Sequence, residues 1–150
     1  MAVRRAALFP ALAVLFVAGC ASAPRPAEYC TELRGAGPGS DAIEPAATGS
    51  ARLEIEGTMI RFRIRTSKDL GKVVATHLHA GRAGVNGPMA HELNPGFTGE
   101  LLEGSTTVTP EIAAAVVADP AGYYVKLHSL KFPGGAIRGQ LKRCDGSAVE

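Results

Sequence analysis

Two neighbouring segments with strict alternation of polar and apolar residues, 51–56 and 60–65, constrain the fold of this chain most. In both segments every second residue is apolar, and the positions between them in the second segment are Arg61, Arg63 and Arg65. Side chains alternate between the two faces of a strand, so each segment predicts a strand with one buried face and one solvated, arginine-bearing or mixed face. Gly57 lies between the segments and indicates a turn, which predicts a β-hairpin.

Four further segments have strand patterns, at residues 73–80, 97–102, 123–129 and 137–143. We also expect an edge strand at residues 29–33 and, because residues 81–96 are rich in glycine, a long loop there. The sequence Thr109-Pro110-Glu111 is typical of a helix start, and Asp119-Pro120 ends this helix. Together these patterns predict a mainly β domain, a Greek-key β-sandwich or barrel with one short crossover helix.

The N-terminus has the pattern of an export signal. Two arginines precede an apolar run at residues 6–18, which is short for a transmembrane helix. The run ends in Val17-Ala18-Gly19-Cys20, which resembles a bacterial lipobox, where cleavage before the cysteine leaves an N-terminal residue that carries lipid. The resemblance implies a lipid on Cys20 that binds the membrane, and a location in the bacterial cell envelope, facing the periplasm or the cell surface. An ordinary secretory signal, cleaved near residues 21–23, is the alternative.

The expected organisation is a signal peptide at residues 1–19, a tether at 20–28, a folded domain at 29–145 and a short tail at 146–150. The signal peptide contains two of the 16 basic residues and none of the 14 acidic ones, so 14 of each remain and the mature chain is close to neutral. Such a chain, without a basic cluster, has no electrostatic footprint for nucleic acid, and we exclude this partner class.

Two cysteines remain once Cys20 is assigned to the lipid. Cys30 and Cys144 lie at opposite ends of the predicted domain, and an oxidising compartment favours a disulfide between them. In the chain-entropy model a bridge that closes nearly the whole domain stabilises it by up to about 5 kcal/mol. Two free thiols are the alternative.

Histidines are the candidate ligands of a metal ion. His77 and His79 project from the same face of one predicted strand, His128 lies on a later strand, and His91 lies in the predicted loop. Imidazole nitrogen suits copper and zinc, so we interpret the four histidines as a ligand set for copper, with zinc as the weaker choice. Alternatively, His77 and His128 are buried polar residues with protein partners, while the other two are exposed near the loop.

Arg138 and Gln140 share one face of the last predicted strand and are candidates to line a cleft beside the histidines. The guanidinium group offers a planar pair of donors to a carboxylate or other anion. We favour a structural role for both residues, which would hold the turn at residues 132–135. A hydrolase is disfavoured, because the chain has no Gly-x-Ser-x-Gly motif and no cysteine left to act as nucleophile.

Several motifs, in a fixed order, carry a family resemblance. They are Ala47-Thr48-Gly49-Ser50-Ala51, then Thr76-His77-Leu78-His79 with Asn86-Gly87-Pro88, and finally residues 124–128 with residues 132–141. With them, the chain from about residue 33 to 143 resembles a CHRD domain, a module named after chordin and also found in bacterial exported proteins. One departure is Ala136, where the family usually has glutamate. The resemblance implies an extracytoplasmic β-sandwich but little chemistry, so function must be argued from the site.

A looser similarity is to copper-zinc superoxide dismutase, which also has a His-x-His strand, a glycine-rich loop with a histidine, and a late histidine. The corresponding residues are His77, His79, His91 and His128, whereas the zinc ligands and the electrostatic loop have no counterpart. The fold is thus expected to be immunoglobulin-like or superoxide-dismutase-like. We expect a non-enzymatic, envelope-anchored binding module that holds copper through its histidines. The alternatives are a dismutase-like copper redox enzyme and a structural or protein-interaction domain without metal.

Overall fold

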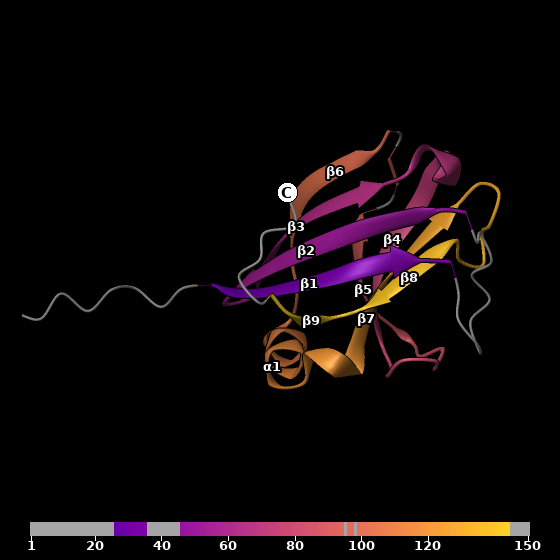
Figure 1. Ribbon diagram of the computed structural model, residues 1–150. Helices are drawn as coiled ribbons and strands as arrows, with labels where there is room; N and C mark the ends of the chain where they lie inside the picture. The colour runs from indigo at the N-terminus through magenta and orange to yellow at the C-terminus, as the bar shows by residue number, and fades with distance from the viewer. Residues whose placement is uncertain (1–25, 36–45, 95, 98, 145–150) are drawn as a thin grey trace, which may run out of the picture.

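The structure, a computed structural model, describes residues 26–35, 46–94, 96–97 and 99–144 (Figure 1). The predicted signal peptide, Cys20, most of the tether and the tail lie outside these residues. The described elements, in chain order, are β1 (Ala27–Arg34), β2 (Thr48–Glu56), β3 (Met59–Thr66), the 3-10 helix η1 (Lys68–Leu70), β4 (Val73–Ala80), β5 (Met89–Asn94), β6 (Leu101–Thr107), α1 (Pro110–Ala118), the 3-10 helix η2 (Pro120–Gly122), β7 (Tyr123–Ser129), β8 (Ile137–Gln140) and β9 (Lys142–Arg143). No helix among the described residues is long and apolar enough to cross a membrane.

The strands form one antiparallel sheet that curls into a nearly closed barrel. Their order is β5-β4-β7-β8-β1-β2-β3-β6, and β9 pairs with β1. In Figure 1, β1, β2 and β3 lie in front while β4, β5 and β7 lie behind them, so that the two halves enclose a common core. The prediction of a mainly β barrel or sandwich with one short helix is therefore confirmed.

The predicted hairpin is the most regular part of the barrel. β2 pairs with β3 without a register shift, with Leu53 opposite Phe62, and both side chains lie in the core. Gly57 turns the chain with a φ of 58°, a conformation that glycine adopts without strain. The outward arginines form ion pairs, including Arg61 with Glu56 and Arg63 with a glutamate on β6.

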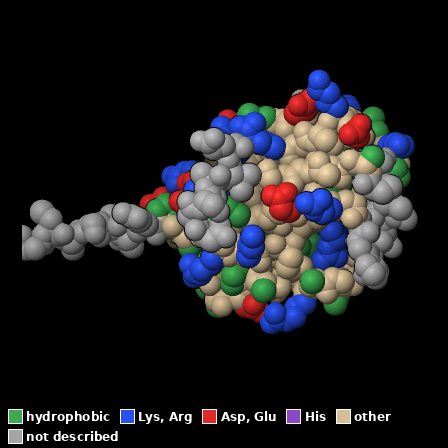
Figure 2. Space-filling view, in the orientation of Figure 1, with side chains coloured by type: hydrophobic (Ala, Val, Ile, Leu, Met, Phe, Trp, Pro, Cys, Tyr) green, Lys and Arg blue, Asp and Glu red, His purple; other side chains and the backbone are tan. Residues whose placement is uncertain are grey.

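The outer face over β1–β3 is solvated, as predicted. Figure 2 shows basic and acidic side chains interspersed across it. Exposed pairs of this kind contribute about 0–1 kcal/mol each. The charged side chains therefore keep this face hydrated, and their ion pairs add little to the stability of the fold.

β1 was predicted as an edge strand, and this prediction is wrong. It lies in the middle of the sheet, where it pairs with β2 along its whole length and also with β8 and β9. Its inward residues Tyr29 and Leu33 are completely buried. The strands on both sides of β1 come from distant parts of the sequence, so the local pattern of residues 29–33 does not show that β1 is a central strand.

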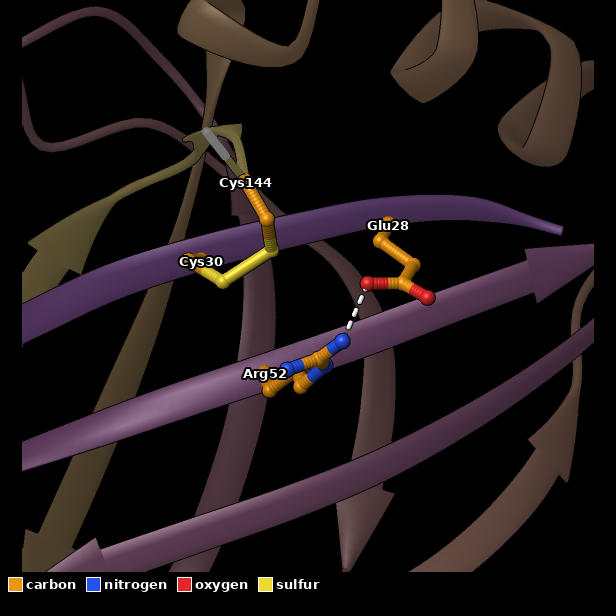
Figure 3. The surroundings of a disulfide bond; sticks show 4 residues. All are labelled: Glu28, Cys30, Arg52 and Cys144. Atoms are coloured by element: carbon orange, nitrogen blue, oxygen red, sulfur yellow. Dashed lines mark hydrogen bonds and ion pairs between the residues drawn. A yellow bond between two sulfur atoms is a disulfide. The ribbon is translucent and has the colours of Figure 1, made fainter. Parts of the chain in front are cut away.

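The predicted disulfide is confirmed. Cys30 on β1 is bonded to Cys144, which follows β9, and their Cα atoms are 5.1 Å apart. Figure 3 shows this bridge beside the ion pair between Glu28 and Arg52. The disulfide thus fixes the C-terminal end of the described chain to the central strand.

Three other boundaries differ from the sequence-based expectations. The predicted loop at 81–96 ends early, because residues 89–94 form β5. The strand expected at 97–102 is β6, which starts only at Leu101. Residues 137–143 form two strands, β8 and β9. The helix begins as predicted, since Thr109 caps it by accepting a hydrogen bond from the Ile112 amide.

Candidate metal centre

Three histidines from the adjacent strands β4 and β7 converge on the outer side of the barrel. Leu78 and Val125 are opposite one another in the register and belong to the core. His77, His79 and His128 occupy alternate positions of the same two strands and therefore face away from that core. Their candidate ligand atoms all lie within 4.8 Å of one another, and all three side chains are half-buried. We call these three residues the histidine cluster.

Backbone carbonyls fix the orientation of two of the three rings. Nδ1 of His79 lies 3.0 Å from the carbonyl oxygen of Gly87, and Nδ1 of His128 lies 2.8 Å from that of Pro133. A carbonyl oxygen only accepts, so in both rings Nδ1 carries the proton and donates it. Nε2 is then left with a free lone pair in each ring.

These two Nε2 atoms are the most informative feature of the site. Both are buried and have no hydrogen-bond partner among the described residues. A buried polar atom without a partner costs about 1–3 kcal/mol. Metal-ligating histidines commonly have this arrangement, in which one ring nitrogen donates to a carbonyl and the other binds the ion.

The distances are compatible with a shared ion after small side-chain rotations. Bonds of about 2 Å place two nitrogens of one ion no more than about 4 Å apart. The 4.8 Å spread of the histidine cluster exceeds this limit only slightly. The residues present therefore fit a copper or zinc ion, both of which imidazole ligands suit.

Burial keeps the histidine cluster neutral. It is the main cause that lowers the pKa of His77, His79 and His128 below 6.5, and the mutual repulsion of the rings adds to it for His77 and His79. The neighbouring Lys126 lowers all three pKa values further. Neutral imidazole is the form that binds a metal, so at neutral pH little proton release opposes uptake.

The segment at residues 81–88, which we call the site loop, covers one side of the histidine cluster. Gly87, near its C-terminal end, makes two contacts: its carbonyl accepts from His79, and its amide donates to the Tyr124 hydroxyl at 3.1 Å. Tyr124 is 1 % exposed although it lies outside the core, and its ring stacks on His79 with 5.0 Å between centroids. The barrel exterior thus has a second, partly polar packed region here.

Arg138 and Gln140 hold the site loop in place. Arg138 donates from Nη1 to the carbonyl of Val85 at 3.0 Å, and its guanidinium lies 3.5 Å above the Tyr124 ring. Gln140 donates from Nε2 to the carbonyl of Gly81 at 2.8 Å. Both residues have the structural role that we favoured, but they hold the site loop and not the turn at residues 132–135.

Comparison with known proteins agrees with the motifs of the sequence. The model of the CHRD domain family matches residues 30–141, about three quarters of the chain. The chain belongs to the CHRD domain family. No curated protein and no solved structure matches it. The histidine cluster, the site loop and the disulfide all lie within this CHRD domain or at its border.

His91 is not brought to the histidine cluster of the CHRD domain. It lies on β5 opposite the core residue Leu78, and its Nε2 is 2.9 Å from the Thr106 hydroxyl of β6. β5 and β6 are the two ends of the sheet order, so this hydrogen bond links the edges of the nearly closed barrel. The fourth histidine of the predicted ligand set therefore has a structural contact on the other face of the sheet.

Sequence reasoning missed the two carbonyl acceptors, on Gly87 and Pro133. Every residue has a carbonyl, so its use as an acceptor leaves no compositional signal. It also missed Tyr124 as a wall of the site, because a tyrosine in a strand reads as a core residue. The Asn86-Gly87-Pro88 motif was the available clue, since such a turn places backbone groups close to the preceding strand.

Proposed function

We propose that this protein is a non-enzymatic CHRD binding module that holds one copper ion in the histidine cluster. The observation that carries the proposal is the pair of buried Nε2 atoms, on His79 and His128. They have no hydrogen-bond partner in the part of the chain that the structure describes, while their Nδ1 atoms donate to carbonyls. His77 supplies the third imidazole. Membership of the CHRD family supports a binding role, and the metal and its identity are our inference.

Copper is preferred to zinc on the composition of the ligand set. Structural zinc sites use four protein ligands, and catalytic zinc sites combine three with a bound water. The histidine cluster has three imidazoles and, close to them, the cationic side chains of Lys126 and Arg138, which repel a doubly charged ion. Among the metals that imidazole binds, copper alone also has a stable monovalent state in proteins.

A metal-binding assay with matched histidine variants tests this function. We expect the purified full chain to take up about one equivalent of copper, measured by elemental analysis after dialysis. The His77→Ala/His79→Ala double variant should lose most of this copper. His91→Ala is the control, because His91 lies on the other face of the sheet. Equal copper in all three proteins, or none in the wild type, would contradict the proposal.

The same preparations decide between the alternative functions. Turnover of superoxide by the copper-loaded protein, lost in the double variant, would favour the redox enzyme. Uptake of neither copper nor zinc would favour a protein-interaction domain.

We also propose that lipid on Cys20 anchors the module in the cell envelope. The support is the Val17-Ala18-Gly19-Cys20 sequence at the end of an apolar run. Labelled palmitate should be incorporated into the wild type and not into Cys20→Ser. Labelling of both proteins would rule out Cys20 as the lipid site.

A further inference from the structure

The edge strand β5 brings a sulfur-containing side chain to the histidine cluster. Met89, its first residue, lies directly opposite His79 of β4 in the register. Directly opposed residues of an antiparallel pair share a face, with Cβ atoms about 4.5–5.5 Å apart. The register therefore places Met89 on the same side of the sheet as the three imidazoles, beside His79.

A register shift is what puts Met89 in this position. Leu78 pairs with His91, and the next residue, His79, pairs with Met89, so that Ala90 is the extra residue of a bulge. In a regular ladder Ala90 would face His79, and Met89 would turn to the opposite side of the sheet. Ala90 instead packs against the core. Bulges commonly serve to re-aim a side chain beside a functional site.

Met89 is also free to move toward an ion. Its side chain is 54 % exposed, although methionine more commonly fills gaps in cores. Its three rotatable side-chain bonds allow the sulfur to move without a change of backbone.

Glu92 is the competing ligand on the same edge strand, since it lies opposite His77. Its carboxylate is not among the ligand atoms that lie within 4.8 Å of one another. A carboxylate would favour a hard or divalent ion, whereas a thioether is soft and selects Cu(I). The cationic side chains of Lys126 and Arg138 also repel a monovalent ion less than a divalent one.

We infer that Met89 is a fourth, thioether ligand of the histidine cluster and makes this centre select Cu(I) over Cu(II) and zinc. The inference rests on the proposed copper site and adds its sulfur ligand and its oxidation state. No electron transfer is required, because the site takes up Cu(I) as such.

Binding of Cu(I) and of zinc by Met89→Leu tests this inference. Leucine conserves the volume and the apolar character, so the variant is expected to fold. All proteins are the full chain with Cys20→Ser, which removes the lipid and any unmodified thiol that would compete for Cu(I). Loss of a group that only orients a ligand costs about tenfold to 100-fold in affinity, so loss of the sulfur should weaken Cu(I) binding about tenfold or more. Zinc affinity should change less than about twofold.

Met59→Leu is the matched control. Met59 is the other methionine among the described residues, is 40 % exposed, and begins β3, which pairs with neither β4 nor β5. It should bind Cu(I) as the wild type does. X-ray absorption of the Cu(I) protein should show a sulfur neighbour that is absent in Met89→Leu.

The possible failures are distinguishable. If the wild type binds Cu(I) and Met89→Leu binds it equally well, the sulfur ligand is refuted while the copper site stands. Equal losses for Cu(I) and zinc would refute the selectivity. If the wild type binds no copper, both the proposed function and this inference fail.

Discussion

At the scale of single residues, the chemistry of the histidine cluster depends on which nitrogen carries the proton. The carbonyls of Gly87 and Pro133 hold the proton on Nδ1 of His79 and His128. The Nε2 atoms of both rings, each with a free lone pair, then lie on the same side of the sheet as His77. This choice of tautomer is made by the backbone, so it survives changes of many neighbouring side chains.

The same residues make the metal-free protein sensitive to acid. Burial lowers the pKa of His77, His79 and His128, with Lys126 adding to the effect and Glu92 opposing it at His77. Below pH 6.5 the unfolded chain binds protons that the folded protein does not, so stability falls with falling pH. The loss begins near pH 6.5 and continues down to the lowered pKa values.

Thermal unfolding of the metal-free protein at pH 7.5 and 5.5 measures this dependence. We expect a lower melting temperature at pH 5.5, and a smaller difference when all three residues of the histidine cluster are changed to glutamine. His91→Gln keeps the histidine cluster and should behave as the wild type. A triple variant with the wild-type difference would place the acid sensitivity elsewhere.

At the scale of elements, the site loop determines how His79 is held. A Cβ atom on Gly87 would lie 1.5 Å from the carbonyl oxygen of Ala80, which no side chain can tolerate. We therefore expect Gly87→Ala to displace the site loop and remove the acceptor for His79. Loss of such an orienting partner should weaken copper binding about tenfold to 100-fold, measured by competition with a chelator.

Gly57→Ala is the control for this prediction. Gly57 lies in the β2–β3 hairpin and has a positive φ, and the space around it is open. Alanine there should lower stability through backbone strain and leave copper affinity unchanged. If Gly87→Ala folds and binds copper as tightly as the wild type, the site loop does not position His79.

Local elements were predictable from the sequence, and non-local ones were not. The β2–β3 hairpin and the start of α1 follow from alternation, Gly57 and the Thr109 cap, which all act within a few residues. The central place of β1 depends on pairing with strands about 15 to 110 residues away. The sequence does not predict β5, because it lies within the glycine-rich residues 81–96 and is defined by its pairing with β4.

For the candidate site, the sequence predicted the three histidines of the cluster but not the contacts made by β5. The two-residue spacing of His77 and His79 indicates a shared face, and His128 joins them because β7 pairs with β4. His91 is not brought to these histidines. A residue in a predicted loop has no expected side of the sheet, so the sequence could not show this. Met89 was missed because only the bulge in β5 turns it toward His79.

At the scale of the whole molecule, the barrel consists of two halves that meet where β1 and β8 pair. This seam has a single residue pair in register, Arg34 with Arg138, whereas β1 and β2 pair over eight residues. The C-terminal end is held to β1 by the two-residue strand β9 and by the disulfide to Cys30. The histidine cluster lies on the half that contains β8. The contacts that join the two halves therefore also help to hold the strands of the site in place.

The disulfide should therefore contribute a large share of the stability. It joins residues that are 114 positions apart, and for a loop of this size the chain-entropy model gives about 5 kcal/mol, with about 2–5 kcal/mol usually lost on removal. We expect the Cys30→Ser/Cys144→Ser double variant to lose about this much in urea unfolding. The reduced wild type should show the same loss, because it lacks the same cross-link. Unchanged stability in both proteins would mean that β9 and the core hold the C-terminal end without the disulfide.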